Sequence, residues 1–188
     1  MTAVPARSPR RYDPERKSRI IDAAIDVIAD HGVAGTTSRR IAAAADVPLG
    51  SLTYHFTTLE DLLTQAFQRF AETISPRYEA RFDDVRDLTG FVDAVTSLIS
   101  ADADVDPREW TVSYELYLAA LRNPALRSVT ESWMRRSRAV LERFVDPVTA
   151  RGVDALIEGL VMHMTLSTTT FSRAETRTII ARFVGIPA

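Results

Sequence analysis

Four polar side chains lie close together between residues 50 and 56, in the segment Gly-Ser-Leu-Thr-Tyr-His-Phe. Its two large apolar residues, Leu52 and Phe56, are four apart and would both face inward from a helix. The outer faces are then left to the polar residues Ser51, Thr53, Tyr54 and His55. Hydroxyl and imidazole groups of this kind form hydrogen bonds with the edges of DNA bases and with phosphates. Each residue taken alone is better explained as an exposed surface residue, so the interpretation depends on the elements around them.

Those elements form a helix-turn-helix pattern. The sequence predicts an amphipathic helix over residues 14–31, ended by Gly32, and a short helix over 38–45 capped by Thr36 or Thr37. Asp46 lies at a turn where a residue that tolerates positive φ is needed. A third helix over 49–56 follows Pro48, and the second helix of such a motif enters the major groove of DNA.

The rest of the chain is predicted to be helical as well, since it has 3.6-residue apolar periodicity and no period-two strand. Pro76 is expected to kink or end the fourth helix. The sequence therefore indicates an all-α fold of about nine helices, with an N-terminal three-helix helix-turn-helix domain and a C-terminal helical bundle. The expected divisions are a flexible basic arm at 1–12, the helix-turn-helix domain at 13–56 and the helical bundle at 57–188. Further helices are expected at about 59–76, 89–100, 107–122, 124–145, 148–169 and 172–184.

Composition excludes several classes of protein. The 188 residues are 46% apolar and 26% charged, as in an ordinary globular protein, and no apolar run reaches the roughly 18–20 residues of a membrane span. The absence of Cys excludes disulfides and thiolate metal sites, and the N-terminus lacks the apolar core of a secretory signal. A cytoplasmic location is therefore expected. The net charge is only −2, but the first 19 residues hold six basic and two acidic residues, which suits either a phosphate-binding arm or a solvated terminus.

No catalytic or metal constellation is evident. The acidic run Asp102, Asp104 and Asp106 resembles the start of a calcium loop, but Pro107 replaces the turn glycine and Ser113 the last ligand. The three histidines are far apart in sequence, and there is no phosphate-binding glycine loop or nucleophile elbow. We expect no enzyme activity, no cofactor and no metal.

Over about residues 18–65 the sequence resembles the TetR family of bacterial transcriptional regulators. The resemblance implies a homodimer that places the third helix of each subunit in one major groove of a palindromic operator. It departs from the family at Asp46, where Gly is usual, and at Leu59, where Lys is usual; Thr58 could replace part of the lost phosphate contact. The residues that carry the resemblance are Ala23-Ala24, His31-Gly32, Thr36-Thr37, Ile41-Ala42, Ala45-Asp46-Val47, Gly50 to Phe56 and Leu62-Leu63. The DNA contacts that it implies are Thr37, Arg39, Ser51, Thr53, Tyr54 and His55.

The resemblance also implies a small-molecule effector inside the C-terminal bundle. The segment from Pro107 carries a mostly aromatic stripe, which is explained either by core packing or by the wall of a ligand cavity. The ligand-binding candidates are Phe91, Trp110, Tyr114, Tyr117, Trp133, Met162 and His163.

The last two helices are the expected dimer interface. Small residues three and four apart let another helix approach closely, although packing within one subunit would explain them too. The interface candidates are Gly152, Ala155, Leu156, Gly159, Leu160, Ile179 and Phe183.

The leading hypothesis is a ligand-responsive regulator, most simply a repressor, that binds double-stranded operator DNA and a small effector and has no membrane contact. In this hypothesis the effector tilts the fourth helix and changes the distance between the recognition helices. A helical interaction protein without specific DNA binding is the alternative, and an enzyme of the C-terminal bundle is disfavoured because no acid–base pair or nucleophile is visible.

Overall fold

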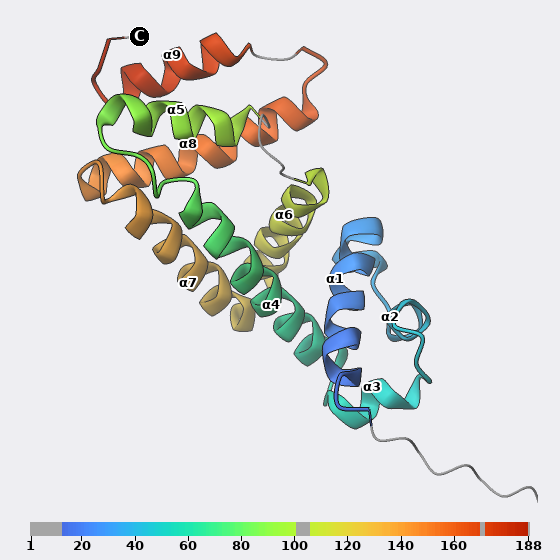
Figure 1. The fold of residues 1–188 in the computed structure, drawn as a ribbon. Helices are drawn as coiled ribbons and strands as arrows, with labels where there is room; N and C mark the ends of the chain where they lie inside the picture. Colours follow the sequence, from blue (N-terminus) through green and yellow to red (C-terminus); the bar gives the residue numbers. More distant parts are fainter. Residues whose placement is uncertain (1–12, 101–105, 170–171, 188) are drawn as a thin grey trace, which may run out of the picture.

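The computed structural model describes residues 13–100, 106–169 and 172–187, and within them the chain forms nine helices and no strand (Figure 1). This confirms the predicted all-α fold. The acidic run at 102–104 and the arm at 1–12 lie outside the described residues. The helices are α1 (Arg16–Gly35), α2 (Ser38–Ala44), α3 (Gly50–His55), α4 (Leu59–Ala80), α5 (Leu88–Ile99), α6 (Pro107–Arg122), α7 (Pro124–Leu141), α8 (Pro147–Leu166) and α9 (Arg173–Phe183).

Local capping signals set most helix starts. Asp106, Asn123 and Asp146 each precede a proline and accept a hydrogen bond from a backbone N–H in the first turn of α6, α7 and α8. Ser172 and Glu175 form the complete capping box predicted for α9. The strongest sequence signals for helix starts are thus confirmed.

The regular part of the first helix ends at Gly32 as predicted, where the backbone takes φ 65° and ψ 171°, and a separate further turn then continues to Gly35. The fourth helix differs from the expectation, since it continues through Pro76 to Ala80. Pro76 lacks only its own N–H, so the turn behind it loses one hydrogen bond while the packing of α4 holds the helix together.

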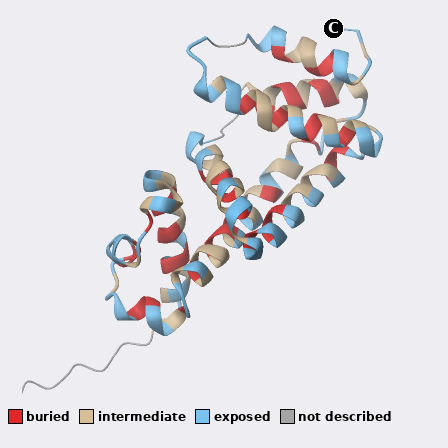
Figure 2. Ribbon diagram, turned by 180° about the vertical axis from the view of Figure 1, so that it is seen from behind, coloured by how far each residue is buried: buried red, intermediate tan, exposed pale blue. Residues whose placement is uncertain are grey.

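Two hydrophobic cores lie at the two ends of the molecule, and Figure 2 shows the buried residues on the inward faces of the helices. The first core joins α1–α3 to α4 and also takes in Leu116 of α6 and Leu126 of α7. The second lies mainly between α5, α8 and α9. The first core therefore crosses residue 56, so helices α1–α3 and the bundle share packing across the predicted domain boundary.

Candidate functional site

The turn between α2 and α3 presents α3 on the outside of the first core. Asp46 takes φ 50° and is the one non-glycine residue with positive φ in the described ranges, as the sequence predicted for this turn. Leu52 and Phe56 are both buried and attach α3 to the core. This packing fixes which face of α3 points to solvent.

The polar residues of α3 divide into three environments. Tyr54 is 81% exposed and Thr53 is exposed beside it, while His55 is half-buried with its ring edge-on to that of Tyr54. Ser51 differs from the expectation, because it is only 9% exposed. It precedes Leu52 on a helix of six residues, and the side of α3 that packs on the core is wide enough to cover it.

The other predicted DNA contacts lie at helix starts nearby. Thr37 caps α2 by accepting from the Arg40 N–H at 3.3 Å, and Arg39 is exposed on the first turn. Thr58 caps α4 by accepting from the Asp61 N–H at 3.0 Å. Hydroxyls that cap helices in this way stay close to the backbone N–H groups that bind phosphate.

A basic residue that the motif did not single out lies beside these helix starts. Lys17, on the first turn of α1, places its Nζ 5.6 Å from the centre of the Phe56 ring. It is exposed, and its charge helps to hold the pKa of the Asp61 carboxyl below its ordinary value, after larger effects of hydrogen bonds from Gln65 and Thr57. Leu59 packs instead against the first core. Lys17 is thus a cation near the position where the family usually has Lys.

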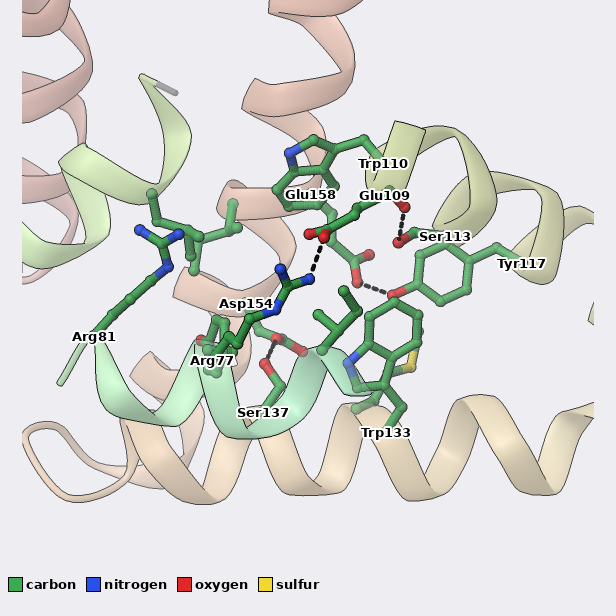
Figure 3. Close-up of a pocket in the computed structure, with 15 residues that line it drawn as sticks. Arg77, Arg81, Glu109, Trp110, Ser113, Tyr117, Trp133, Ser137, Asp154 and Glu158 are labelled. Carbon is green, nitrogen blue, oxygen red and sulfur yellow. Dashed lines mark hydrogen bonds and ion pairs between the residues drawn. The ribbon is translucent and has the colours of Figure 1, made fainter. Parts of the chain in front are cut away.

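A cavity of about 100 Å³ lies in the bundle, walled mainly by α4, α6, α7 and α8 (Figure 3). Aromatic residues form much of its wall, and Trp133 stacks on Tyr117 with ring centres 5.8 Å apart. The lining residues are Ile74, Arg77, Tyr78, Arg81, Leu98, Glu109, Trp110, Ser113, Tyr117, Trp133, Met134, Ser137, Asp154, Ile157 and Glu158.

Two carboxylates one helical turn apart on α8 face this cavity. Asp154 is 9% exposed and accepts a 2.7 Å hydrogen bond from the Ser137 hydroxyl, and Glu158 accepts one from the Tyr117 hydroxyl (Figure 3). Burial raises the pKa of both carboxyls above their ordinary values, although hydrogen bonds from Ser137 and Tyr117 oppose the rise. A buried anion of this kind is costly unless a cation is paired with it.

Helix α6 forms hydrogen bonds with α8 on one side and with α1 on the other. Tyr114 and Tyr117 both donate to Glu158, the first to its backbone oxygen at 3.1 Å. Glu115, between them, points the other way and accepts from the Val33 N–H of α1 at 2.8 Å. Burial is the main cause that raises the pKa of Tyr114 to about 12, so its hydroxyl remains protonated at neutral pH. One turn of α6 thus contacts both parts of the molecule.

The structure brings only some of the predicted ligand residues together. Trp110, Tyr117 and Trp133 line the cavity, and Tyr114 is stacked on Trp110 just outside the lining. The other three predicted residues do not reach it: Phe91 is fully buried in the second core against Phe82 and Phe144, and Met162 and His163 are exposed on α8.

The sequence reasoning missed the polar part of the cavity. Asp154 and Glu158 are the only acidic residues between 147 and 174, and they lie four apart in an apolar helix. That spacing was a usable signal for two charges on one helix face. Tyr78 and Ser137 carry no comparable signal, because their place depends on how α4 packs against α7.

The predicted dimer residues are partly exposed and partly used within the subunit. Phe183 is 48% exposed, Ala155 is exposed, and nothing lies within 4 Å of a Cβ built on Gly159. Gly152 serves a contact within the chain, since its Cβ would lie 2.2 Å from the Phe183 ring. Leu156 and Leu160 are partly buried against the second core, and Ile179 is half-buried.

In the described ranges, no cluster of three or more His or acidic residues is arranged to hold a metal ion. None of the helices seen there is long and apolar enough to cross a membrane.

The sequence matches two family descriptions in tandem. Residues 20–66 match "Bacterial regulatory proteins, tetR family", and residues 86–186 match "Tetracyclin repressor-like, C-terminal domain". A relative in Pseudomonas putida, the HTH-type transcriptional regulator CymR, is 30% identical over 68% of this chain and 62% of its own. The match to PksA of Bacillus subtilis covers 34% of that protein at 34% identity, so the chain aligns with less than two thirds of either curated relative.

Solved structures agree with these matches over nearly the whole chain. A transcriptional regulator of Streptomyces coelicolor A3(2) is 44% identical, with a TM-score of 0.84 over 92% of this chain and 99% of the other. The multidrug binding protein EbrR, crystallised with ethidium, is 39% identical, with a TM-score of 0.75 over 92% of this chain and all of its own. The two tandem family matches, the full-length structural agreement and the helix-turn-helix geometry establish that this chain belongs to the TetR family of bacterial regulatory proteins.

Proposed function

We propose that the protein is a transcriptional repressor that binds a palindromic operator as a homodimer and is released from it by a cationic aromatic effector. The observation that carries the DNA-binding part is the exposed pair Thr53 and Tyr54 on α3. An aromatic side chain that is 81% exposed contributes little to folding. On the outward face of a short helix it is available to DNA.

Substitution of the exposed residues tests DNA binding. Operator sequences are first selected from random DNA, and Thr53→Ala, Tyr54→Ala and His55→Ala should then weaken binding while the dimer stays intact. Thr73→Ala, on the exposed side of α4, is the matched control. Unchanged operator affinity in all three variants would contradict the assignment. Loss of affinity as salt rises separates a regulator from a helical protein that has the fold but does not bind DNA.

The dimer is supported by the apolar surface of α8 and α9. Val148 is 82% exposed, Leu166 is 77% exposed and Phe183 is 48% exposed, and the open surface around Gly159 lies between them along α8. Exposed apolar residues that gather on one face mark an interaction surface. A second copy of the same face would cover it with two-fold symmetry and set the two α3 helices about 34–36 Å apart.

The effector class follows from the lining of the cavity. Trp110, Tyr117 and Trp133 provide aromatic faces, which attract cations as well as flat ring systems. Asp154 and Glu158 add negative charge at the same wall. EbrR has been crystallised in complexes with ethidium, proflavin and malachite green, which supports the same class for this chain.

Release requires the cavity to communicate with α3. Drug-sized ligands occupy pockets of about 300–1,000 Å³, so a cavity of about 100 Å³ must expand to admit one. Its walls include Arg77 of α4 and Glu109 of α6, which form an ion pair. We propose that expansion breaks this ion pair and separates α4 from α6, and that the contact of Glu115 with Val33 transmits the movement of α6 to α1. A coupling free energy of about 1–3 kcal/mol is sufficient to release an operator.

Dye titrations test the effector. Both tryptophans of the chain line the cavity, so intrinsic fluorescence reports binding there directly. Ethidium should quench that fluorescence and release the operator over the same concentration range. Quenching without release would contradict the coupling. Ethidium also intercalates into DNA, so release without quenching would be an effect of the dye on the DNA and would contradict release through the cavity.

A further inference from the structure

Three oxygen-bearing side chains from three helices line the same cavity. They are the Tyr78 hydroxyl from α4, the Ser137 hydroxyl from α7 and the Asp154 carboxylate from α8. Ser137 donates to Asp154 at 2.7 Å, the contact drawn at the base of Figure 3. Since the three come from separate helices, only tertiary packing brings them together.

The Tyr78 hydroxyl is buried and has no hydrogen-bond partner of normal geometry. Burial raises the pKa of this hydroxyl, and the nearby Ser137 hydroxyl opposes the rise. A buried hydroxyl left without a partner costs about 1–3 kcal/mol. Such a cost at a cavity wall indicates a group that is satisfied when the cavity is filled.

The carboxylate of Asp154 also has fewer hydrogen-bond partners than it can accept. Its side chain is 12% exposed, and the nearest cation recorded for it, the guanidinium of Arg138, lies at 3.9 Å, beyond hydrogen-bond distance. The Ser137 hydroxyl satisfies one of its oxygens. A carboxylate has about four lone-pair sites, so Asp154 keeps unused capacity to accept hydrogen bonds.

We propose that Tyr78, Ser137 and Asp154 form a subsite for an ammonium group that carries N–H bonds, so that the effector is an aromatic primary or secondary amine. This rests on the proposed function, in which the cavity takes a cationic aromatic molecule. An ammonium group offers up to three N–H donors, and the wall offers a carboxylate and two hydroxyl oxygens to accept them. A quaternary ammonium has the charge but no donor, so it leaves the Tyr78 hydroxyl unsatisfied.

Glu158 has a different task. Its carboxylate lies one helical turn beyond Asp154 on α8 and already accepts a hydrogen bond from the Tyr117 hydroxyl. Its backbone oxygen accepts a second hydrogen bond, from the Tyr114 hydroxyl. Its charge attracts any cation, whereas the Asp154 subsite distinguishes cations by their N–H bonds. Ligands with a carboxylate are excluded from both positions by charge repulsion.

A matched pair of probes tests this subsite. Naphthylmethylamine, protonated at neutral pH, and its trimethylammonium derivative share ring and charge and differ in N–H bonds. Tryptophan fluorescence quenching of the full chain should show that the amine binds at least about tenfold more tightly, as expected for hydrogen bonds between charged groups. Tyr78→Phe and Asp154→Asn should each bring the affinity ratio towards one, while Tyr54→Phe, on the distant α3, should leave it unchanged.

The outcomes are distinguishable. If the trimethylammonium probe binds more weakly only because it is bulkier, the affinity ratio of the two probes will stay the same in Tyr78→Phe and Asp154→Asn. That result would overturn the subsite. Equal affinity of the two probes in the parent protein overturns it as well, and if ethidium still binds, the proposed effector class stands. No quenching by the probes or by ethidium overturns both proposals. Circular dichroism establishes that each variant is folded.

Discussion

Replacement of Gly32 by Ala tests whether α6 holds the DNA-reading domain through α1. Gly32 has φ 65° and ψ 171°, a conformation that is essentially restricted to glycine and costs another residue about 1–3 kcal/mol. The new Cβ would lie 2.8 Å from Oε1 of Glu115, so that side chain must also move. Its hydrogen bond with the Val33 N–H, now 2.8 Å, would be lost at a cost of about 1.5 kcal/mol.

We therefore expect Gly32→Ala to lower the free energy of unfolding by about 3 kcal/mol and Tm by about 6–12 °C. Thermal unfolding followed by circular dichroism measures this. Glu115→Ala should cost only the hydrogen bond, about 1.5 kcal/mol, and Glu131→Ala, exposed on α7, should cost nothing measurable.

The double variant with Gly32→Ala and Glu115→Ala separates backbone strain from the loss of the Glu115 hydrogen bond. If both single changes remove this same hydrogen bond, the sum of their losses in unfolding free energy will exceed the loss in the double variant by about 1.5 kcal/mol. Strict additivity, or an unchanged Tm for Gly32→Ala, would refute the contact. Glu115→Ala should also bind ethidium normally yet need more dye to release the operator, because one of the contacts through which α6 moves α1 is lost while the Arg108–Asp30 ion pair remains. Release at the parent dye concentration would show that coupling bypasses Glu115.

Four further outcomes follow from individual residues of α1 and α8. Lys17→Ala should weaken operator binding at all sequences and reduce the slope of log affinity against log salt by about one, since Lys17 would neutralise one phosphate; an unchanged slope would contradict this. Gly159→Ala should leave the folded subunit intact or stabilise it by up to about 1 kcal/mol, because its Cβ meets nothing within 4 Å, yet weaken the dimer in sedimentation experiments. Ethidium affinity should fall as pH is lowered through the raised pKa values of Asp154 and Glu158, at pH values above their ordinary 3.8 and 4.5, because the protonated carboxyls no longer attract a cation. The same raised pKa values mean that the folded state binds more protons than the unfolded state in that range, so Asp154→Asn should raise Tm at neutral pH and lose this advantage in acid.

Local signals in the sequence account for most of the fold. Asp106, Asn123 and Asp146 start helices because a side-chain oxygen and a following proline act within one turn. The positive φ of Asp46 is equally local, since the turn between α2 and α3 requires it. These features need no knowledge of the rest of the chain, so the sequence was sufficient to predict them.

The content of the cavity could not be predicted in the same way. Phe91 and Trp110 are both aromatic residues on amphipathic helices, yet the first is enclosed by the second core and the second lines the cavity. What separates them is the direction in which α5 and α6 pack, which depends on contacts far apart in sequence. Ser51 is covered for a related reason, because α3 is too short for its period to define a narrow buried face.

The buried carboxylates of the cavity and its small volume both bear on how an effector would bind. Asp154 and Glu158 are costly to bury as anions without a cation beside them. A cationic effector in the cavity would therefore stabilise both carboxylates. In the proposed mechanism the cavity of about 100 Å³ admits that effector only when α4 and α6 separate. The free energy gained when the cation meets the carboxylates then becomes available only in the expanded state. A ligand with this preference would shift the population towards that state by its differential affinity, and α6, hydrogen-bonded to α1 through Glu115, would carry the shift to the helix-turn-helix.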